Sequence, residues 1–225
     1  MENKLQNIEL CDAFSSLISA GISQPMLSNF IYNKVGLTLN VEYLKIPLTV
    51  TDCWGGVRSK QYPDELAGML MFMYEHRDQI NTYCEIGLDC GGTFYTIDSF
   101  MRATNPNFKG SIGVDVQDRI YKFGFKQYSE KHPSFEFHRS KSIDFILKSP
   151  VDFMLIDGDH SYGGVKADYE RFKGQAKFIA LHDIYYANGV RQLWDEIKNS
   201  GNYVEITNQN TAEFPGSLGI GIIWS

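Results

Sequence analysis

The sequence lacks the marks of several common protein classes. Lysines and arginines are scattered without a basic run, and the net charge is −6, which argues against a general nucleic-acid binder. No stretch approaches the ~18 continuous apolar residues of a membrane span. The opening residues, Met-Glu-Asn-Lys-Leu-Gln-Asn, lack the charged-then-apolar layout of a secretory signal. We therefore expect a cytoplasmic protein without a membrane segment, and nucleic acid is an unfavourable partner.

Cysteine is also scarce. The four cysteines, Cys11, Cys53, Cys84 and Cys90, form no Cys-x-x-Cys pair and no zinc-like spacing. Cys84 lies in an expected strand, where a thiol behaves as a small buried hydrophobe. A reduced setting is the simplest interpretation, although the spacing alone leaves disulfides open.

The 225 residues, 43% of them hydrophobic, suffice for one domain with an appendage. From residue 82 onward, short apolar runs alternate with helical patterns, which predicts a parallel α/β sheet with helices on both faces. The last two strands have no helix between them and form a terminal hairpin, so the sheet is mixed. The expected strands are Tyr83–Ile86, Ser111–Val116, Phe135–His138, Val151–Ile156, Phe178–Leu181, Tyr203–Ile206 and Leu218–Trp224, with helices near 93–103, 118–131, 142–148, 163–173 and 189–199.

The first 80 residues are organised differently. Apolar residues at helical spacing predict a helix over 10–18, and Gln24-Pro25 opens a second one through Tyr32. Val41–Val50 is interrupted by Pro47 and is expected to be extended. Pro63 opens a helix through about residue 77. We divide the chain into an N-terminal, mainly helical cap at 1–80 and a core at 81–225.

A glycine-rich turn follows the first core strand, in Cys84-Glu-Ile-Gly-Leu-Asp-Cys-Gly-Gly-Thr93. Because position 89 is Asp, the Gly-x-Gly-x-x-Gly dinucleotide fingerprint is not met, and no Gly-Lys-Ser/Thr of a P-loop follows. Glycines let the backbone approach a ligand closely. Glu85 suits a ligand that carries a positive charge. Asp115, at the end of the second strand, is placed to hold the two hydroxyls of a ribose.

A second set of reactive groups follows two later strands, in Asp157-Gly-Asp-His160 and His182-Asp183. The carboxyl ends of adjacent parallel strands meet at one edge of the sheet, where ligands bind. Carboxylates with an imidazole favour a divalent site, Mg²⁺ or Mn²⁺ by their oxygen ligands. A histidine held by hydrogen bonds alone is the alternative for His182.

With these motifs placed, the chain resembles class I S-adenosylmethionine-dependent methyltransferases over residues 54–225. It is most similar to small members with the pattern Asp157-Gly-Asp-His-Ser-Tyr-Gly-Gly-Val-Lys-Ala-Asp168, which are related to metal-dependent sugar and catechol O-methyltransferases. This resemblance implies a Rossmann-like seven-stranded sheet whose last strand runs antiparallel. It also implies S-adenosylmethionine as cofactor, with Mg²⁺ or Mn²⁺ as a candidate metal. The relatives carry Asp-Asp or Asp-Asn where this chain has His182-Asp183.

The resemblance assigns roles position by position. The implied cofactor-binding residues are Glu85, Gly87, Gly91, Gly92, Thr93, Asp115, Ser140, Ser142 and Asp157; the implied metal ligands are Asp157, His182 and Asp183. His160 is the preferred general base because its ordinary pKa lies near neutrality, and Asp159 is the second choice. Gln61, Tyr62 and Tyr162 are candidates for closing the pocket.

The expected reaction is transfer of the sulfonium methyl to a hydroxyl of a small molecule, a sugar or another natural product. Two alternatives stay open at this point: a cephalosporin-hydroxylase-like enzyme on the same fold, and a catalytically inactive cofactor-binding partner. The sequence is also compatible with a homo-oligomer.

Overall fold

The computed structural model describes residues 5–36, 57, 59–208 and 216–225. Its centre is a seven-stranded sheet in the order β3-β2-β1-β4-β5-β7-β6. β7 pairs antiparallel with β5 and β6, whereas the other pairs are parallel. The strands are β1 (Thr82–Ile86), β2 (Gly110–Asp115), β3 (Phe135–Arg139), β4 (Val151–Ile156), β5 (Ala176–His182), β6 (Asn202–Ile206) and β7 (Ile220–Trp224). The predicted α/β fold with a terminal antiparallel hairpin is confirmed.

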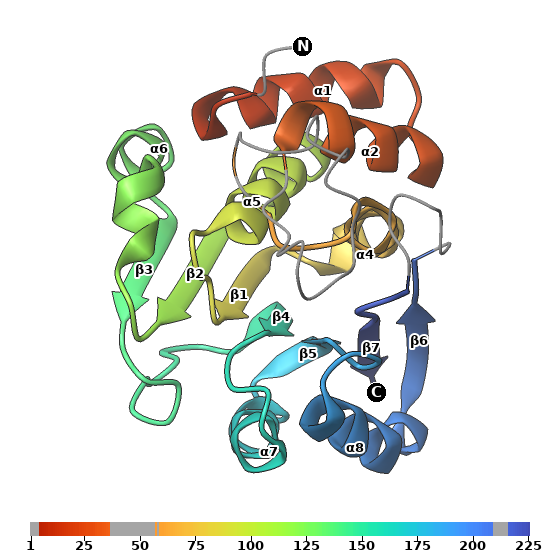
Figure 1. The fold of residues 1–225 in the computed structure, drawn as a ribbon. Helices are drawn as coiled ribbons and strands as arrows, with labels where there is room; N and C mark the ends of the chain where they lie inside the picture. The colour runs from red at the N-terminus through yellow and green to blue at the C-terminus, as the bar shows by residue number, and fades with distance from the viewer. Residues whose placement is uncertain (1–4, 37–56, 58, 209–215) are drawn as a thin grey trace.

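Helices cover both faces of the sheet (Figure 1). One face carries α4 and α5, and the other carries α7 and α8, while α6 lies beside the β3 edge. These helices are α4 (Pro63–Glu75), α5 (Gly92–Thr104), α6 (Phe125–Lys131), α7 (Tyr162–Phe172) and α8 (Asn188–Ile197), with short helical turns η3 (Arg77–Gln79), η4 (Arg119–Phe123) and η5 (Lys198–Ser200). Among the described residues, no helix is long and apolar enough to cross a membrane.

The N-terminal helices form an outer layer over α4 and α5 (Figure 1). They are η1 (Asn7–Glu9), α1 (Leu10–Ser19), α2 (Gln24–Phe30) and the π-helical η2 (Ile31–Val35). Phe14 of α1 packs edge-on against Phe100 of α5, with ring centroids 5.3 Å apart. The two predicted helices of this region are therefore present. The extended segment expected at 41–50 lies outside the described residues, and the domain boundary at residue 80 stays a prediction.

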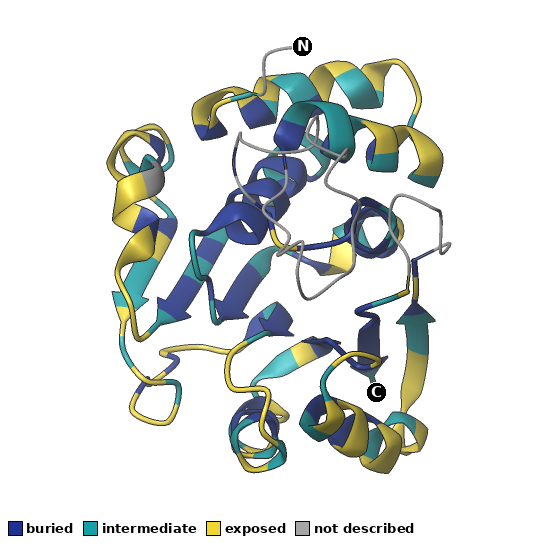
Figure 2. Cartoon of the chain, in the orientation of Figure 1, coloured by how far each residue is buried: buried dark blue, intermediate teal, exposed yellow. Residues whose placement is uncertain are grey.

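Alternation along the strands divides the core into two hydrophobic clusters, one on each face of the sheet. On β4, Phe153 and Leu155 belong to the cluster shared with α1, α2, α4 and α5. Met154 and Ile156 belong to the cluster under α7 and α8. This two-residue period is what a strand covered on both sides requires. The central strands and the inner helices are accordingly the most buried part of the molecule, whereas the edge strands β3 and β6 are partly exposed (Figure 2).

Two helix predictions need correction. The helix expected at 118–131 is divided by Gly124, whose φ of 83° is left-handed, into η4 and α6. The helix expected at 142–148 is absent, and the segment is a turn followed by irregular chain. Arg171 of α7 donates a hydrogen bond to the Phe145 carbonyl of this loop. Ile146 is 76% exposed, so the apolar pattern of this loop does not mark a buried helical face.

Candidate active site

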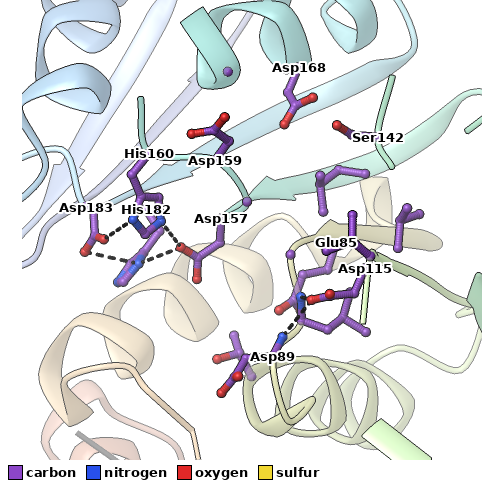
Figure 3. A pocket seen from close by; sticks show the side chains of 18 of the residues that line it. Glu85, Asp89, Asp115, Ser142, Asp157, Asp159, His160, Asp168, His182 and Asp183 are labelled. Carbon is purple, nitrogen blue, oxygen red and sulfur yellow. Dashed lines mark hydrogen bonds and ion pairs between the residues drawn. The ribbon is translucent and has the colours of Figure 1, made fainter. Parts of the chain in front are cut away.

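A single cavity of about 790 Å³ lies at the carboxyl ends of β1, β2, β3, β4 and β5 (Figure 3). Each strand-end loop that was predicted from the sequence to carry site residues contributes to its wall. The predicted site residues that line it are Glu85, Gly87, Gly92, Thr93, Asp115, Ser140, Ser142, Asp157, Asp159, His160, His182 and Asp183. Among the predicted set, Gly91 alone is not part of the lining. The fold therefore gathers motifs separated by about a hundred residues into one place.

The β1–α5 loop is shaped by its glycines and by Asp115. Gly87 has φ of 88°, and a Cβ there would lie 2.3 Å from the Asp157 carbonyl oxygen, so only glycine fits. Gly91, the N-cap of α5, also has a left-handed φ and faces Ile120, not the cavity. Asp115 accepts hydrogen bonds through Oδ2 from the backbone N–H of Leu88, at 2.8 Å, and of residue 89, at 3.0 Å. The predicted ribose acid thus also holds the loop in position.

Glu85 is the most deeply buried acid of the cavity wall, with 1% of its surface exposed. Its Oε2 accepts a hydrogen bond of 2.6 Å from the Tyr83 hydroxyl. Burial raises the pKa of Glu85 well above its ordinary value, and the hydrogen bond from Tyr83 only partly opposes that rise. A cation bound in the cavity would lower this pKa and stabilise the carboxylate.

Ser140 and Ser142 lie at the opposite end of the cavity, after β3. The backbone N–H of Ser140 donates to the Asp115 carbonyl at 3.0 Å, which fixes this loop beside the end of β2. Ser142 faces Asp168 of α7 (Figure 3). Burial raises the pKa of Asp168, and the Ser142 hydroxyl opposes part of that rise.

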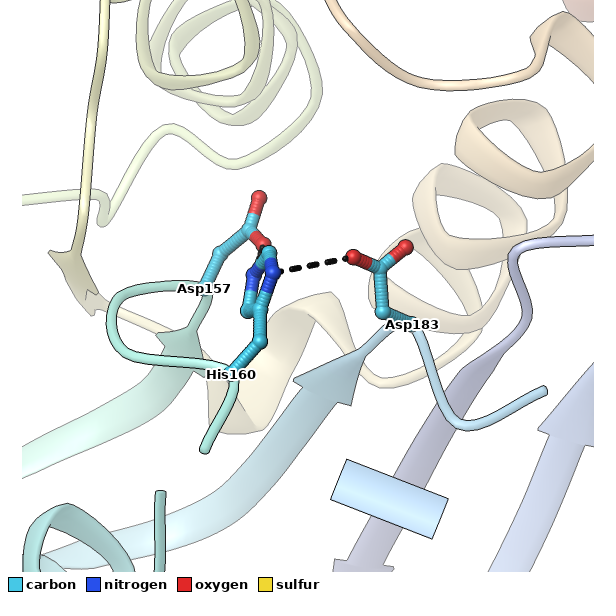
Figure 4. Close-up of side chains that lie close together, drawn as sticks. All are labelled: Asp157, His160 and Asp183. Atoms are coloured by element: carbon cyan, nitrogen blue, oxygen red, sulfur yellow. Dashed lines mark hydrogen bonds and ion pairs between the residues drawn. The ribbon is translucent and has the colours of Figure 1, made fainter. Parts of the chain in front are cut away.

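Two aspartates and two histidines form a closed group between β4 and β5 (Figure 3). His182 Nδ1 lies 3.0 Å from Asp157 Oδ1 and 3.3 Å from Asp183 Oδ1. His160 lies on the outer side of the same carboxylates, with Nε2 3.2 Å from Asp157 Oδ1 and Nδ1 3.4 Å from Asp183 Oδ2 (Figure 4). Each carboxylate therefore contacts both imidazoles.

Burial and charge act against each other in this group. Burial lowers the pKa of His182, but the carboxylates of Asp157 and Asp183 outweigh it and raise the pKa to about 10. Burial raises the pKa of Asp157, and the two histidines reverse that effect and hold it well below its usual range. A hydrogen bond to Asp157 raises the pKa of His160. At His182 the protein by itself thus favours a protonated imidazole beside the ionised carboxylate of Asp157, whereas burial raises the pKa of Asp183.

The backbone at Asp183 is in an uncommon conformation for a residue with a side chain, with φ of 65°. Its carbonyl accepts hydrogen bonds from the N–H groups of Tyr186, at 3.2 Å, and Ala187, at 3.0 Å. The resulting turn aims the Asp183 carboxylate at His160 and His182, and it carries Tyr186 onto the cavity wall. Such a strained position is typical of functional sites.

The Asp159 side chain has different contacts from those of its neighbour His160. Its Oδ1 accepts a hydrogen bond of 2.9 Å from the Ser161 N–H, and its carboxylate packs against Gly164 at the start of α7. The hydrogen bonds from Ser161 lower the pKa of Asp159. A carboxylate engaged in this way is a weaker proton acceptor than His160.

The three residues suggested for closing the pocket lie in different places. Gln61 Nε2 donates to Asp157 Oδ2 at 3.4 Å. Tyr62 is buried and does not line the cavity. The Tyr162 hydroxyl instead donates to Glu196 at 2.9 Å on the outer side of α7, so Tyr162 does not close the pocket.

Sequence reasoning missed several residues of the lining, among them Lys60, Asp89, Asp168 and Tyr186. Asp168 and Asp89 stand inside the quoted motifs and could have been found there. Lys60 precedes the glycine loop by about thirty residues, and no local pattern links the two. Tyr186 enters through the turn at Asp183, which is a feature of tertiary structure.

The group fits a divalent metal ion. Asp157, His160 and Asp183 each offer a ligand atom, and these atoms lie within 4.8 Å of one another. Asp183 Oδ1 is buried without a hydrogen-bond partner, which leaves coordinating capacity unused, whereas protonated His182 offers a metal no lone pair. His160 is therefore a candidate ligand beside Asp157 and Asp183, and the role of His182 as a metal ligand stays a prediction. An imidazole with two carboxylates suits Mn²⁺ and other transition metals better than Mg²⁺.

The sequence matches no protein-family model and no curated protein. Solved structures match the fold. An rRNA methylase from Streptococcus thermophilus has a TM-score of 0.55 at 10% identity, over 72% of this chain and 96% of that chain. A protein described as an RNA methyltransferase from Pyrococcus horikoshii has 0.54 at 11%, over 89% and 94%. One described as a caffeoyl-CoA O-methyltransferase from Staphylococcus aureus has 0.52 at 12%, over 97% and 100%. The chain therefore has the class I methyltransferase fold.

Proposed function

We propose that the protein is an S-adenosylmethionine-dependent methyltransferase that acts on a hydroxyl of a small molecule. The observation that carries the proposal is the charge of the cavity. Its lining contains seven carboxylates, Glu85, Asp89, Asp115, Asp157, Asp159, Asp168 and Asp183, against two lysines, Lys60 and Lys141, and two histidines, His160 and His182. Such a wall attracts a sulfonium cation and repels the phosphates of a nucleic acid.

The cofactor would lie along the strand ends from β1 to β3. Glu85, Gly87, Gly92 and Thr93 would surround its methionine side, and Asp115 would accept the ribose hydroxyls. Asp115 Oδ1 already accepts the Gln117 N–H at 2.7 Å, and a carboxylate oxygen can accept a second donor. Ser140 and Ser142 would contact the adenine. Gly91 would not contact the cofactor; its left-handed backbone would shape the β1–α5 loop.

The chemistry is an in-line attack of the acceptor oxygen on the sulfonium methyl. The enzyme mainly has to position the two reactants and remove the hydroxyl proton. His160 is the preferred base because it lines the cavity and is 43% exposed on the side chain, so a substrate can reach it. Tyr186 and Leu218, from the turn after β5 and the entry to β7, would form the wall against which the acceptor lies.

A divalent ion, if the enzyme uses one, would be held by Asp157, His160 and Asp183. When bound, it would lower the pKa of the acceptor hydroxyl. His160 would then be a metal ligand and not the base. The acceptor hydroxyl, bound to the ion, would be more acidic than the free alcohol. Mn²⁺ fits the donor set better than Mg²⁺.

Calorimetry tests the cofactor without knowledge of the acceptor. Folded protein should bind S-adenosylmethionine and S-adenosylhomocysteine and should not bind NAD. Absence of binding by both sulfur compounds would overturn the proposal. Methyl transfer to a panel of sugar and phenol hydroxyls then separates this function from a hydroxylase on the same fold and from an inactive cofactor-binding partner.

The metal is tested separately. Protein freed of metal with EDTA should bind Mn²⁺, and Asp157→Asn and Asp183→Asn should each weaken that binding. If methyl transfer continues unchanged in excess EDTA, the metal has no part in the reaction and His160 remains the base.

A further inference from the structure

A buried glutamate of α4 contacts the chain on both sides of a residue that lines the cavity. Glu65 is fully buried and is not itself part of the lining. Its Oε1 accepts hydrogen bonds from the backbone N–H of Asn208, at 3.1 Å, and of Gly219, at 3.0 Å. The same oxygen accepts a third hydrogen bond from the Ser217 hydroxyl. One carboxylate oxygen of a helix thus holds the chain after β6 and the chain before β7.

The residues next to these donors hold the turn that follows β5. The Leu218 carbonyl accepts a hydrogen bond of 2.9 Å from the Tyr185 N–H, and the Gly219 carbonyl accepts one of 3.3 Å from the Ile184 N–H. Gly219 has φ of 80°, and a Cβ there would lie 2.4 Å from Tyr185 Cδ2. The entry to β7 and the turn after β5 are therefore in close contact, so that a shift of one displaces the other.

Both segments contribute side chains to the cavity. Leu218 and Tyr186 line it, and they are the residues against which the acceptor is proposed to lie. We call these two residues the acceptor wall. The turn that carries Tyr186 begins at Asp183, whose carboxylate contacts His160. The position of the acceptor wall depends on backbone contacts that lead back to Glu65.

A carboxylate at this buried position costs stability unless its hydrogen bonds are needed. Burial raises the pKa of Glu65, and the hydrogen bonds from Ser217, Gly219 and Asn208 oppose only part of that rise. The second oxygen, Oε2, is buried and has no hydrogen-bond partner among the described residues. An apolar side chain of similar length would avoid both costs. What it would not supply is an acceptor on which three donors converge.

We propose that Glu65 is a positioning residue for the acceptor. By holding Ser217 and Gly219, it fixes Leu218 and the turn at Asp183–Tyr186, and so determines where the acceptor wall stands relative to the reacting methyl group. This inference rests on the proposed function, because that function assigns this part of the cavity to the acceptor. It gives a residue that touches neither reactant a part in acceptor selectivity.

Two substitutions separate the acceptor oxygen of Glu65 from its charge. Glu65→Gln removes the charge and keeps a carbonyl oxygen for the same donors, whereas Glu65→Met removes both at similar length. Amide hydrogen exchange followed by NMR should be about tenfold faster or more at Ile184 and Tyr185 in Glu65→Met, with the amides of β2 unchanged. Glu65→Gln should keep the original rates. Both variants should bind S-adenosylhomocysteine within about twofold of the original protein.

Turnover provides a measurement that a purely structural role would not change. With the sugar or phenol of the panel that the original protein methylates fastest, Glu65→Met should raise the KM for that compound by about tenfold and leave the KM for S-adenosylmethionine unchanged. Glu65→Gln should restore the original KM. Glu75→Met, at the exposed end of the same helix, is the matched control and should behave as the original protein in every measurement.

Each outcome supports or overturns the inference. Original exchange rates at Ile184 and Tyr185 in Glu65→Met would overturn it, and so would faster exchange throughout the sheet together with a loss of S-adenosylhomocysteine affinity. If Glu65→Met fails to fold, Ser217→Ala tests the same contact from the other side: faster exchange at both amides supports the inference, and original rates contradict it. A starting protein that does not bind S-adenosylhomocysteine would refute the proposed function, whereas the exchange rates would still decide whether Glu65 positions this wall.

Discussion

His182 Nδ1 lies 3.0 Å from Asp157 Oδ1, across the boundary between two neighbouring strand ends. His182 is 4% exposed, so this contact is made almost without water. The carboxylates around it overcome the effect of burial and raise its pKa to about 10. A charged imidazole therefore belongs to the folded state over most of the accessible pH range.

This ion pair predicts a pH dependence of stability. The pKa of His182 is higher in the folded protein than in the unfolded chain, so its contribution is complete below about pH 6.5 and is lost as pH rises towards 10. Relative to His182→Asn, the original protein should be more stable by a few kcal/mol at pH 6 and by less at pH 10. Denaturant unfolding in EDTA measures both values; a difference that grows with pH would contradict this assignment.

His160 should titrate above its ordinary pKa. The hydrogen bond to Asp157 raises the pKa of His160, so NMR of labelled histidine should give a midpoint higher than 6.5. Asp157→Asn removes the negative charge and should move the midpoint down. A midpoint that stays in place in this variant would show that another group controls His160.

Glu85→Gln should gain stability and lose cofactor selectivity. Burial raises the pKa of Glu85, so the folded protein binds its proton more tightly and the ionised carboxylate costs stability as pH rises above 4.5. The variant should unfold at a higher denaturant concentration at pH 8, with the difference vanishing near pH 4. It should also lose the preference for S-adenosylmethionine over the uncharged thioether of S-adenosylhomocysteine. Calorimetry at pH 8 that finds the preference intact would remove Glu85 from sulfonium recognition.

Gly87→Ala should damage both folding and binding. Its left-handed φ and the Asp157 carbonyl 2.3 Å from the added Cβ leave no room for a methyl group, and we expect a loss of about 2 kcal/mol or more. Gly163→Ala, in the first turn of α7, is the matched control, because nothing lies within 4 Å of its added Cβ. Thermal unfolding of both variants should show a large decrease for the first and little change for the second.

The sequence predicted the sheet well because its strands are short apolar runs separated by helical patterns, and each face of the sheet is covered. It placed Asp157, His160 and Asp183 at one edge for the same reason, since parallel strands end together. The direction in which these side chains point could not be predicted from the sequence. Which imidazole offers a ligand atom together with Asp157 and Asp183 depends on side-chain direction, and the positive φ of Asp183 sets the direction of one of these carboxylates.

The errors also have local causes. The 142–148 segment has the apolar residues of a helix, but Ile143 and Ile146 are exposed, so no buried face supports a helix there. Gly124 interrupts a helix because its left-handed φ ends η4. Lys60 joined the site through a contact with Asp89, and such a long-range pairing leaves no periodic trace in a single sequence.

The surplus of carboxylates in the cavity has a consequence for turnover under the proposed reaction. Methyl transfer converts the positively charged sulfonium into a neutral thioether, so the attraction between the wall and the cofactor decreases at the moment the product forms. The charge of the wall therefore favours the incoming cofactor over the spent one, and it favours release of the product only after the methyl group has left.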